Sequence, residues 1–247
     1  MDQLEVGEHK IHFDERKHVY RDDKSGLPVR GVTSVLKVLN KPALIQWSAN
    51  MAASYVLENL PAENDLSMIE KICHEAKTAH RRFTKDAADI GTAVHKFAEN
   101  TLRDGKAPTT PKDEKTANGC KAFLEWFQAH KIEPIHLEQM VFHPDWWYAG
   151  TADFYGKIDG GLCVLDFKTS SGLYIEHILQ IAAYTAALER MFDTKIEGGW
   201  IVRLDKKTGK FSAHWIKRSD EDQLAFRHLL ELDKHIERLD NKLKELK

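Results

Sequence analysis

The stretch GTADFYGKIDGGLCVLDFKTS, residues 150–170, decides the fold expected for this chain. Two runs of alternating apolar and polar residues flank Asp-Gly-Gly, which is typical of a tight hairpin turn. If Asp159 and Gly160 are the two central residues of the turn, the register places Asp153 directly opposite Asp166. The sequence therefore predicts two carboxylates on one face of a hairpin.

Lys168 follows Asp166 by two residues, so strand alternation places its ammonium on the face of the carboxylates. Phe154, Leu165 and Phe167 point the opposite way, into a core. Opposed carboxylates repel unless a cation lies between them, and oxygen ligands suit Mg²⁺ or Mn²⁺, which activate water. The pattern predicts a metal site whose lysine orients or deprotonates water. The alternative is an ordinary salt bridge on an exposed strand, and a three-residue loop would remove the predicted register.

Outward from this hairpin, the hydrophobic period alternates between helix and strand, which predicts an α/β fold. Helices are expected over 33–39, 42–60, 113–131 and 174–191, a helix-rich stretch over 66–103, and strands over 135–142, 148–158, 162–167, 199–204 and 211–216, with a short hairpin over 10–20. Residues 219–247 carry apolar side chains at heptad spacing. That segment either docks on the body of the protein or pairs with another chain.

The composition indicates a soluble, folded, intracellular protein. The 247 residues have a net charge of -2 and 42% hydrophobic residues, which neither predicts nor excludes a nucleic-acid partner. No apolar run reaches the length of about 20 residues that spans a membrane, so no membrane association is expected. Cys73, Cys120 and Cys163 are widely spaced, which argues against a disulfide framework. All three are expected to be buried.

Four motifs resemble those of the PD-(D/E)XK nuclease superfamily, and most closely its RecB-like exonuclease branch. In chain order they are Gly91-x-x-x-His95-x-x-x-Glu99, Gly-Thr-Ala-Asp153, Leu-Asp166-Phe-Lys168-Thr-Ser and Gln180-x-x-x-Tyr184. The first element of the family's Pro-Asp pair is leucine here, which leaves the acidic ligand in place. RecB-like relatives with an iron-sulfur cluster use four flanking cysteines, so no iron-sulfur cluster is expected in this chain.

The resemblance covers roughly residues 85–217 and implies a PD-(D/E)XK core, with a mixed central β-sheet flanked by helices. The whole chain, 1–247, is then a single nuclease domain. It would comprise an N-terminal hairpin and helical addition over 1–84, the nuclease core over 85–217, and a long amphipathic C-terminal helix over 218–247.

The resemblance also implies roles for individual residues. His95, Asp153, Asp166 and the main-chain carbonyl of Phe167 would hold Mg²⁺ or Mn²⁺. Lys168 would assist the attacking water, so that Asp153, Asp166 and Lys168 form the catalytic set.

Four further residues are candidates around that set. Glu99 would hold a metal-bound water or steady His95, because it lies one turn further along the helix. Glu138 would be a further acidic residue at the site, with a surface charge as the alternative. Gln180 and Tyr184 would contact DNA, with packing of the helix on the sheet as the alternative.

Nucleic acid also needs a path to the site. Phosphate contacts are expected from basic residues, among them Arg81, Arg82, Lys85 and Arg203. Trp147 is a candidate for stacking on unpaired bases, and we expect either Trp147 or its neighbour to face outward; core packing is the alternative.

The resulting hypothesis is a metal-dependent DNA exonuclease that acts from free ends, with a preference for single strands, in DNA recombination, repair or replication. The alternatives are a structure- or sequence-specific endonuclease and a non-catalytic nucleic-acid-binding protein on the same fold. DNA is the expected partner. The C-terminal helix leaves pairing with a second copy of the chain open, as the alternative to docking on the protein's own body.

Overall fold

The computed structural model describes residues 3–39, 41–61 and 65–246. Internal contacts divide the chain into two compact units. The first unit comprises residues 1–39 and 94–247, and the second comprises residues 40–93. The domain boundaries expected at 84 and 217 stay a prediction.

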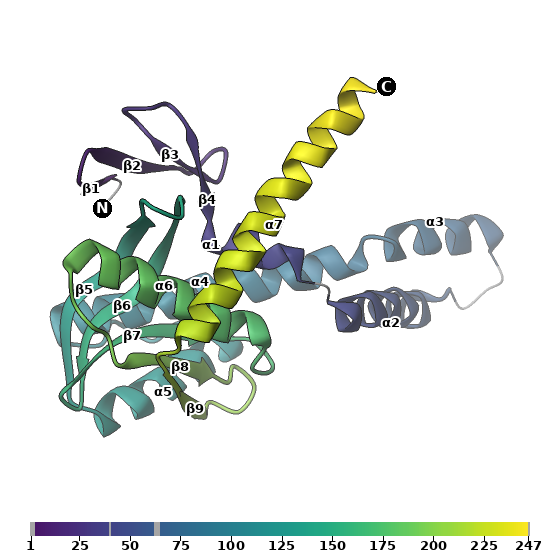
Figure 1. Ribbon diagram of the computed structural model, residues 1–247. Helices are drawn as coiled ribbons and strands as arrows, with labels where there is room; N and C mark the ends of the chain where they lie inside the picture. Colours follow the sequence, from purple (N-terminus) through teal and green to yellow (C-terminus); the bar gives the residue numbers. More distant parts are fainter. Residues whose placement is uncertain (1–2, 40, 62–64, 247) are drawn as a thin grey trace. The chain divides into compact units, whose positions relative to one another are not determined.

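The first unit is built on one mixed β-sheet, which has nine strands among the described residues (Figure 1). The strands are β1 (Gln3–Val6), β2 (His9–Asp14), β3 (Val19–Asp22), β4 (Pro28–Gly31), β5 (Ile132–His143), β6 (Tyr148–Ile158), β7 (Gly161–Lys168), β8 (Gly198–Leu204) and β9 (Phe211–Lys217). They follow the order β1-β2-β3-β4-β6-β7-β8-β9, with β5 also paired to β6. The β4–β6 and β7–β8 pairs are parallel, and the other pairs are antiparallel.

Helices flank this sheet, as the sequence predicts for an α/β fold. The helical segments of the first unit are α1 (Val32–Val35), η1 (Leu36–Val38), the part of α4 (Ala79–Asp104) that follows residue 93, α5 (Glu114–Ala129), α6 (Ile175–Phe192) and α7 (Asp220–Glu245). Phe167 packs edge-on against Phe123 and Trp126 of α5. Val164 and Tyr184 belong to the core cluster under α6. The sheet is therefore covered by α5 and α6.

The hairpin between β6 and β7 has the predicted register as far as Phe154 and Leu165, where the ladder ends, so the predicted Asp153–Asp166 pair is not part of it. Phe154 pairs with Leu165, and Ile158 pairs with Gly161. The two central turn residues, Asp159 and Gly160, have φ angles of 52° and 91°. Positive φ at both positions is the geometry of a tight hairpin turn, for which Asp-Gly is well suited.

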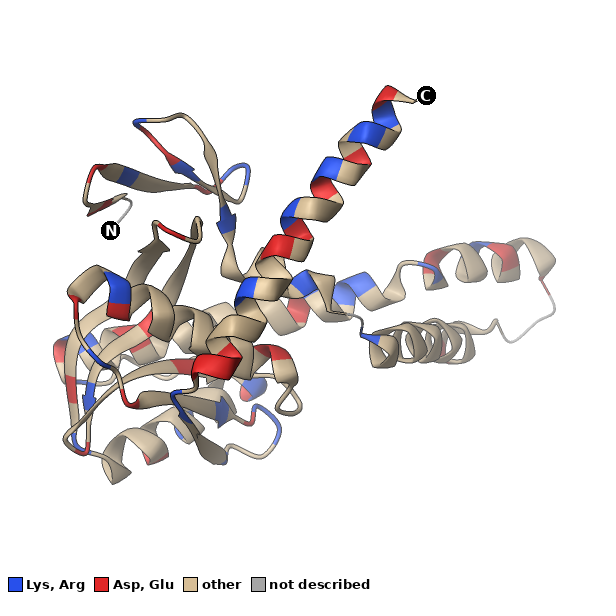
Figure 2. Ribbon diagram, viewed as in Figure 1, with Lys and Arg blue, Asp and Glu red and all other residues tan. Residues whose placement is uncertain are grey.

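The long helix α7 is half docked. Phe226 and Leu230, in its first half, are fully buried, and Arg30 pairs with Asp233 at 2.9 Å. The apolar residues further along are exposed: Leu232, Ile236, Leu239, Leu243 and Leu246. Figure 2 shows that basic and acidic residues alternate along the same helix. Docking therefore accounts for only the first half of the heptad pattern.

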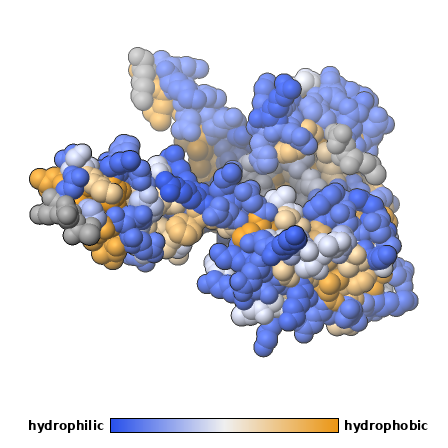
Figure 3. All heavy atoms as spheres, turned by 180° about the vertical axis from the view of Figure 1, so that it is seen from behind, coloured by the Kyte–Doolittle hydropathy of each residue, from blue (hydrophilic) through white to orange (hydrophobic). Residues whose placement is uncertain are grey.

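The second unit consists of α2 (Pro42–Asn59), α3 (Leu66–Ala76) and the first part of α4. The Tyr55 hydroxyl donates a hydrogen bond to Glu75 (2.7 Å), which joins α2 to α3. Apolar side chains also lie on its surface, including Leu44, Ile45, Leu57 and Leu66 (Figure 3).

The expectation that all three cysteines are buried is wrong for Cys73. Cys120 and Cys163 are buried, and Cys73 is exposed. Ile72 and Ala76 form the buried stripe of α3, four residues apart, and Cys73 falls outside that stripe. Over the ranges that the structure describes, no helix is both long and apolar enough to cross a membrane.

Asp22 organises the N-terminal strands. Its buried carboxylate accepts hydrogen bonds from the Lys10 amide (2.9 Å), the Ser25 amide (3.2 Å) and the Ser25 hydroxyl (2.7 Å). Burial by itself would raise the pKa of Asp22, but hydrogen bonds from Ser25, Lys10 and His9 hold it well below its ordinary value. The charged form is therefore the one that the fold stabilises.

We expect Asp22→Asn to lower the free energy of unfolding by about 1–3 kcal/mol at neutral pH. Because the pKa is lowered in the folded state, this contribution is complete above the unfolded pKa of about 4 and is lost as the pH falls below it. Urea denaturation of wild type and variant across this pH range measures the difference. Asp240→Asn, on the exposed part of α7, is the control, and a gap between Asp22→Asn and wild type that does not shrink in acid would contradict the assignment.

Candidate metal centre

The site forms where β7 leaves β6 and continues beside β8. Beyond the Phe154–Leu165 pair, β7 residues pair with β8, for example Asp166 with Ile201. At this fork the Asp153 side chain replaces a strand partner, because its Oδ2 accepts a hydrogen bond of 2.7 Å from the Phe167 amide. The divergence of two strands therefore creates the space in which the acidic side chains gather, and it fixes the orientation of Asp153.

His95 approaches from α4, in the part that belongs to the first unit. Its Nδ1 lies 3.3 Å from Asp153 Oδ2, and its ring packs edge-on against Phe167. Burial would lower the pKa of His95, but the adjacent Asp153 carboxylate raises it to about 9. In the metal-free protein, His95 therefore carries the positive charge that balances Asp153.

Glu138 lies on β5, opposite Asp153 of the neighbouring strand β6. The flanking pairs are Leu137 with Phe154 and Gln139 with Ala152, so Glu138 falls opposite Asp153. Its φ of 49° breaks the regular strand at this point. One ligand atom each from His95, Glu138 and Asp153 lie within 4.8 Å of one another. Glu138 is half-buried, and burial and the Asp153 charge raise its pKa to about 7.

A chain of polar contacts links Asp166 to α6. The Lys168 ammonium lies 2.5 Å from Asp166 Oδ2 and donates a hydrogen bond of 2.7 Å to Gln180 Oε1. The Gln180 amide nitrogen in turn donates to the Tyr184 hydroxyl (2.8 Å). Both groups of Gln180 are thus engaged within the protein, so that it positions Lys168 beside Asp166.

Two observations show that these residues fit a divalent cation. Asp166 is only 3% exposed, and its Oδ2 accepts no hydrogen bond from the described residues, although the Lys168 ammonium lies beside it. Burial raises the pKa of Asp166, which means that the surroundings do not compensate its charge fully. Carboxylate oxygens with one imidazole are a donor set suited to Mg²⁺ or Mn²⁺.

Glu99 is held by neighbouring residues of its own helix. Glu99 is paired with Lys96 (2.8 Å) and Arg103, and no described contact joins it to His95. Burial opposes the ionisation of Glu99, but these two cations lower its pKa. Glu99 is therefore a stable anion on α4, held by its own helix.

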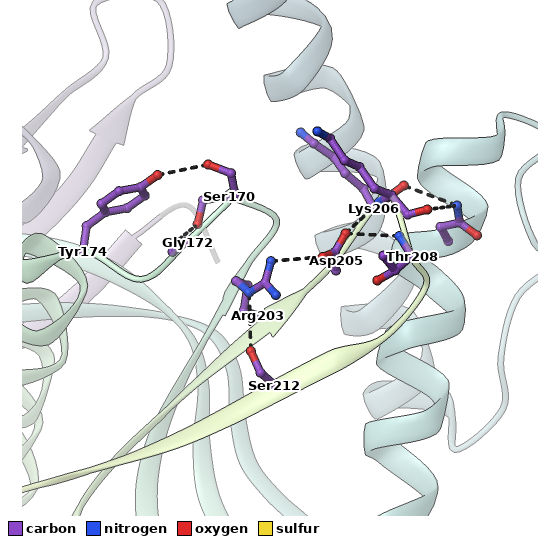
Figure 4. Close-up of polar contacts among 11 residues, drawn as sticks. Ser170, Gly172, Tyr174, Arg203, Asp205, Lys206, Thr208 and Ser212 are labelled. Carbon is purple, nitrogen blue, oxygen red and sulfur yellow. Dashed lines mark hydrogen bonds and ion pairs between the residues drawn. The ribbon is translucent and has the colours of Figure 1, made fainter. Parts of the chain in front are cut away.

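Arg203 is brought close to the metal centre. It pairs in register with Lys168 across β7 and β8, and Figure 4 shows its guanidinium group contacting Asp205 and Ser212. Asn118 of α5 donates to the carbonyls of Lys206 and Lys207, which anchors the following turn. The β8–β9 turn, which carries Lys206, Lys207 and Lys210, is thus anchored to α5 through its backbone.

Arg81, Arg82 and Lys85 belong to the second unit. All three are exposed, and the Arg82 guanidinium lies over the Tyr55 ring at 5.4 Å. A cation is attracted to the face of an aromatic ring, so this contact favours the observed position of the Arg82 guanidinium.

The expectation that one of the adjacent tryptophans faces outward is wrong. Trp146 and Trp147 are both partly buried. The Trp147 indole packs against His9 and Phe142 and donates to the Pro28 carbonyl (3.0 Å). Its φ of 62° departs from regular strand geometry, and strand alternation therefore does not govern its direction.

Sequence reasoning missed one residue pair beside the site. The Tyr20 hydroxyl lies 3.0 Å from Thr151 Oγ1, although 131 positions separate the two residues. Thr151 precedes Asp153 by two residues on β6, and this spacing was the available signal. Nothing in the sequence indicates Tyr20, because β3 reaches β6 only through β4.

Comparisons with known proteins yield only distant similarities. No protein-family model matches the chain, and no curated protein does. An alkaline exonuclease from Laribacter hongkongensis, LHK-Exo, is 13% identical over 82% of this chain and 99% of its own, with a TM-score of 0.35. The same protein in complex with dAMP matches 81% of this chain and 97% of its own, at 13% identity and a TM-score of 0.36.

A third structure, of the protein SSO0001, is 20% identical with a TM-score of 0.28. That match covers 43% of this chain and 48% of SSO0001, so the chain spans about half of that protein's length. With TM-scores this low, none of the three likenesses decides what the chain does.

Proposed function

We propose that this protein is a metal-dependent DNA exonuclease of the PD-(D/E)XK superfamily, from its RecB-like branch. The observation that carries the proposal is the fork between β6 and β7, where His95, Glu138 and Asp153 lie within 4.8 Å of one another and Lys168 contacts Asp166. An acidic cluster beside a positioned lysine is suited to the hydrolysis of phosphodiester bonds. DNA recombination, repair or replication is the proposed setting, inside a cell.

His95, Glu138, Asp153, Asp166 and the Phe167 carbonyl would hold Mg²⁺ or Mn²⁺. When bound, such a cation polarises the scissile phosphate and lowers the pKa of a water molecule. The chain's own residues do the positioning: the Phe167 amide orients Asp153, and Gln180 orients the Lys168 ammonium.

Lys168 supplies the positive charge that matches the build-up of negative charge on the phosphate. Its ammonium is 2.5 Å from the Asp166 carboxylate, so the positive charge lies next to the acidic side chains. Donation of a hydrogen bond from Nζ that orients the attacking water is its proposed second role.

The remaining candidates are proposed to guide the DNA. Arg203, next to Lys168 in the sheet, contacts a phosphate near the cleaved bond. Gln180 and Tyr184 are buried and bonded to each other, so their proposed role toward the DNA is to position Lys168. Glu99 supports His95 through the helix, and Arg81, Arg82 and Lys85 contact more distant phosphates. Trp147 stacking on a base is kept as a weaker proposal, because its ring is already packed.

The test compares linear single-stranded DNA, linear duplex and a covalently closed circle, all labelled, with Mg²⁺ or Mn²⁺. We expect both metals to support degradation of linear substrate while the circle stays intact. Cutting of the circle would favour the endonuclease alternative. Binding without any cleavage would favour a non-catalytic nucleic-acid-binding protein.

We also propose that α7 pairs with α7 of a second copy. Leu232 and Leu239 are each 47% exposed, and Leu243 is 56% exposed, at heptad-like spacing. A Leu239→Lys, Leu243→Lys double variant is expected to turn a dimer into a monomer, as measured by light scattering after size-exclusion chromatography. Lys242→Ala is the control on the same helix, and a monomeric wild type at all concentrations would contradict the pairing.

A further inference from the structure

A pocket of about 250 Å³ opens beside the candidate metal centre, within the first unit. Its walls come from the β2–β3 hairpin, the segment joining β4 to α1, strand β6 and helix α6. Its lining includes Phe13, Tyr20, Gly31, Thr33, Thr151 and Tyr184. The N-terminal strands and the central sheet thus build this pocket together.

The pocket shares residues with the polar network of the site. Tyr184 lines the pocket and accepts the hydrogen bond from Gln180, which in turn accepts one from Lys168. Thr151 lies two residues before Asp153, so both side chains lie on one face of β6, roughly 6.6 Å apart along the strand. One nucleotide unit spans such a separation.

The lining selects for an uncharged, flat and polar group. None of the residues that line the described pocket is Lys, Arg, Asp or Glu. Phe13 forms one aromatic wall with Tyr20 (4.7 Å between ring centroids) and His18 (5.0 Å). Hydroxyl groups of Tyr20, Thr33 and Thr151 supply hydrogen-bond donors and acceptors. A phosphate would find no Lys or Arg side chain among these lining residues, whereas a nucleobase would find both a stacking surface and polar partners.

The size of the pocket agrees with this choice. Sites for drug-sized ligands have volumes of about 300–1,000 Å³, so 250 Å³ suits a smaller group such as one nucleoside. Gly150 allows Tyr184 and Val32 to pack directly against β6, because a Cβ there would lie 2.7 Å from the Tyr184 ring and 3.1 Å from Val32. The wall next to the metal centre is therefore already close-packed.

We propose that this pocket binds the nucleoside of one unpaired nucleotide of the DNA strand, with its base against Phe13 and its phosphate directed toward Asp153. This inference rests on the proposed nuclease function and adds a substrate feature to it. A base can enter the pocket only when it is unpaired, so the pocket makes the protein selective for single-stranded ends.

The test measures binding without cleavage, by fluorescence anisotropy of labelled single-stranded oligonucleotides in buffer containing EDTA. A series of oligonucleotides carries one abasic residue at successive positions. Wild type is expected to bind about tenfold more weakly when the abasic residue occupies the pocket position, because one stacked base is lost.

Two variants address the pocket itself. Phe13→Leu keeps an apolar side chain but removes the ring, and is expected to weaken binding of the intact oligonucleotide about tenfold. Gly31→Val fills the pocket, since a Cβ at residue 31 lies 3.5–3.6 Å from Ser34 and Tyr20 without a clash. Gly161→Val, at a strand glycine away from the pocket with similar room, is the matched control and is expected to bind like wild type.

The abasic oligonucleotide decides whether the pocket holds a base. Phe13→Leu is expected to cause no further loss of affinity for the oligonucleotide whose pocket position is abasic. Equal affinities of wild type, Phe13→Leu and Gly31→Val for intact DNA would overturn the proposal, as would an equal loss on abasic and intact DNA. Cleavage of linear DNA with Mg²⁺ is measured in a separate assay. A protein that does not cleave DNA but binds intact DNA more tightly than abasic DNA would contradict the nuclease function and still support the pocket.

Discussion

Replacing Lys168 with alanine is expected to lower the rate of DNA cleavage by about 100- to 1,000-fold. The Lys168 ammonium lies 2.5 Å from Asp166 and is held by Gln180, so its charge is preorganised where negative charge develops. Alanine removes that charge and leaves the buried Asp166 without its cation. The measurement is single-turnover cleavage of end-labelled linear DNA at saturating metal.

The control for this prediction lies on the same hairpin. Lys157→Ala removes an exposed lysine near the turn of β6 and is expected to cleave at the wild-type rate. Gln180→Leu is a positioning variant: we expect a loss of about tenfold, because a hydrogen bond to a charged group is worth about 1.5–3 kcal/mol and the ammonium remains present. Equal rates for wild type and Lys168→Ala would contradict the role of Lys168.

The second large effect concerns the metal and is measured without cleavage. Saturating Mn²⁺ is expected to stabilise the wild type against urea by about 2.7 kcal/mol at one hundred times its dissociation constant, because the ion binds only the folded chain. Asp153→Asn is expected to lose most of this gain, since it removes a ligand that lies within 4.8 Å of His95 and Glu138. Urea unfolding with and without Mn²⁺ measures the gain in the free energy of unfolding for the wild type and for Asp153→Asn.

Glu138→Gln separates a metal-binding role from a structural one. Burial and Asp153 make the Glu138 carboxylate unfavourable in the metal-free protein, so glutamine is expected to raise the free energy of unfolding in EDTA while it reduces the gain from Mn²⁺. Glu133→Gln on the same strand, where the carboxylate is exposed and pairs with Lys131, is the control and is expected to retain the full gain. A Glu138→Gln variant that gains as much from Mn²⁺ as the wild type would contradict its place in the metal centre.

Local chemistry explains why the centre of the molecule was predictable from the sequence. Asp159-Gly160 favours positive φ at both turn positions, and a two-residue turn leaves one register for the flanking strands. The placement of Lys168 near Asp166 follows from the same alternation. The order of helices and strands was also predictable, because the spacing of apolar residues identifies each helix or strand separately.

Side chains at irregular backbone positions were not predictable in this way. Glu138 and Trp147 both have positive φ, so alternation along a strand does not give their directions. For Glu138 the sequence left a surface charge and a site residue as equal alternatives, and only the opposing strand placed it across from Asp153. The expectation that Trp146 or Trp147 faces outward failed, because both are partly buried and His9 from the N-terminal strands packs against Trp147.

The sequence by itself determined the hairpin and its register as far as Phe154 and Leu165, because turn geometry and strand alternation act over a few residues. The tertiary structure alone decided that β7 leaves β6 beyond Leu165, where Asp153 binds the Phe167 amide in place of a strand pair with Asp166. It also decided that His95 and Glu138 converge on Asp153, and that Tyr20 meets Thr151 beside them. Such contacts join segments far apart in the chain, and they depend on how packed elements divide the available space rather than on any local pattern.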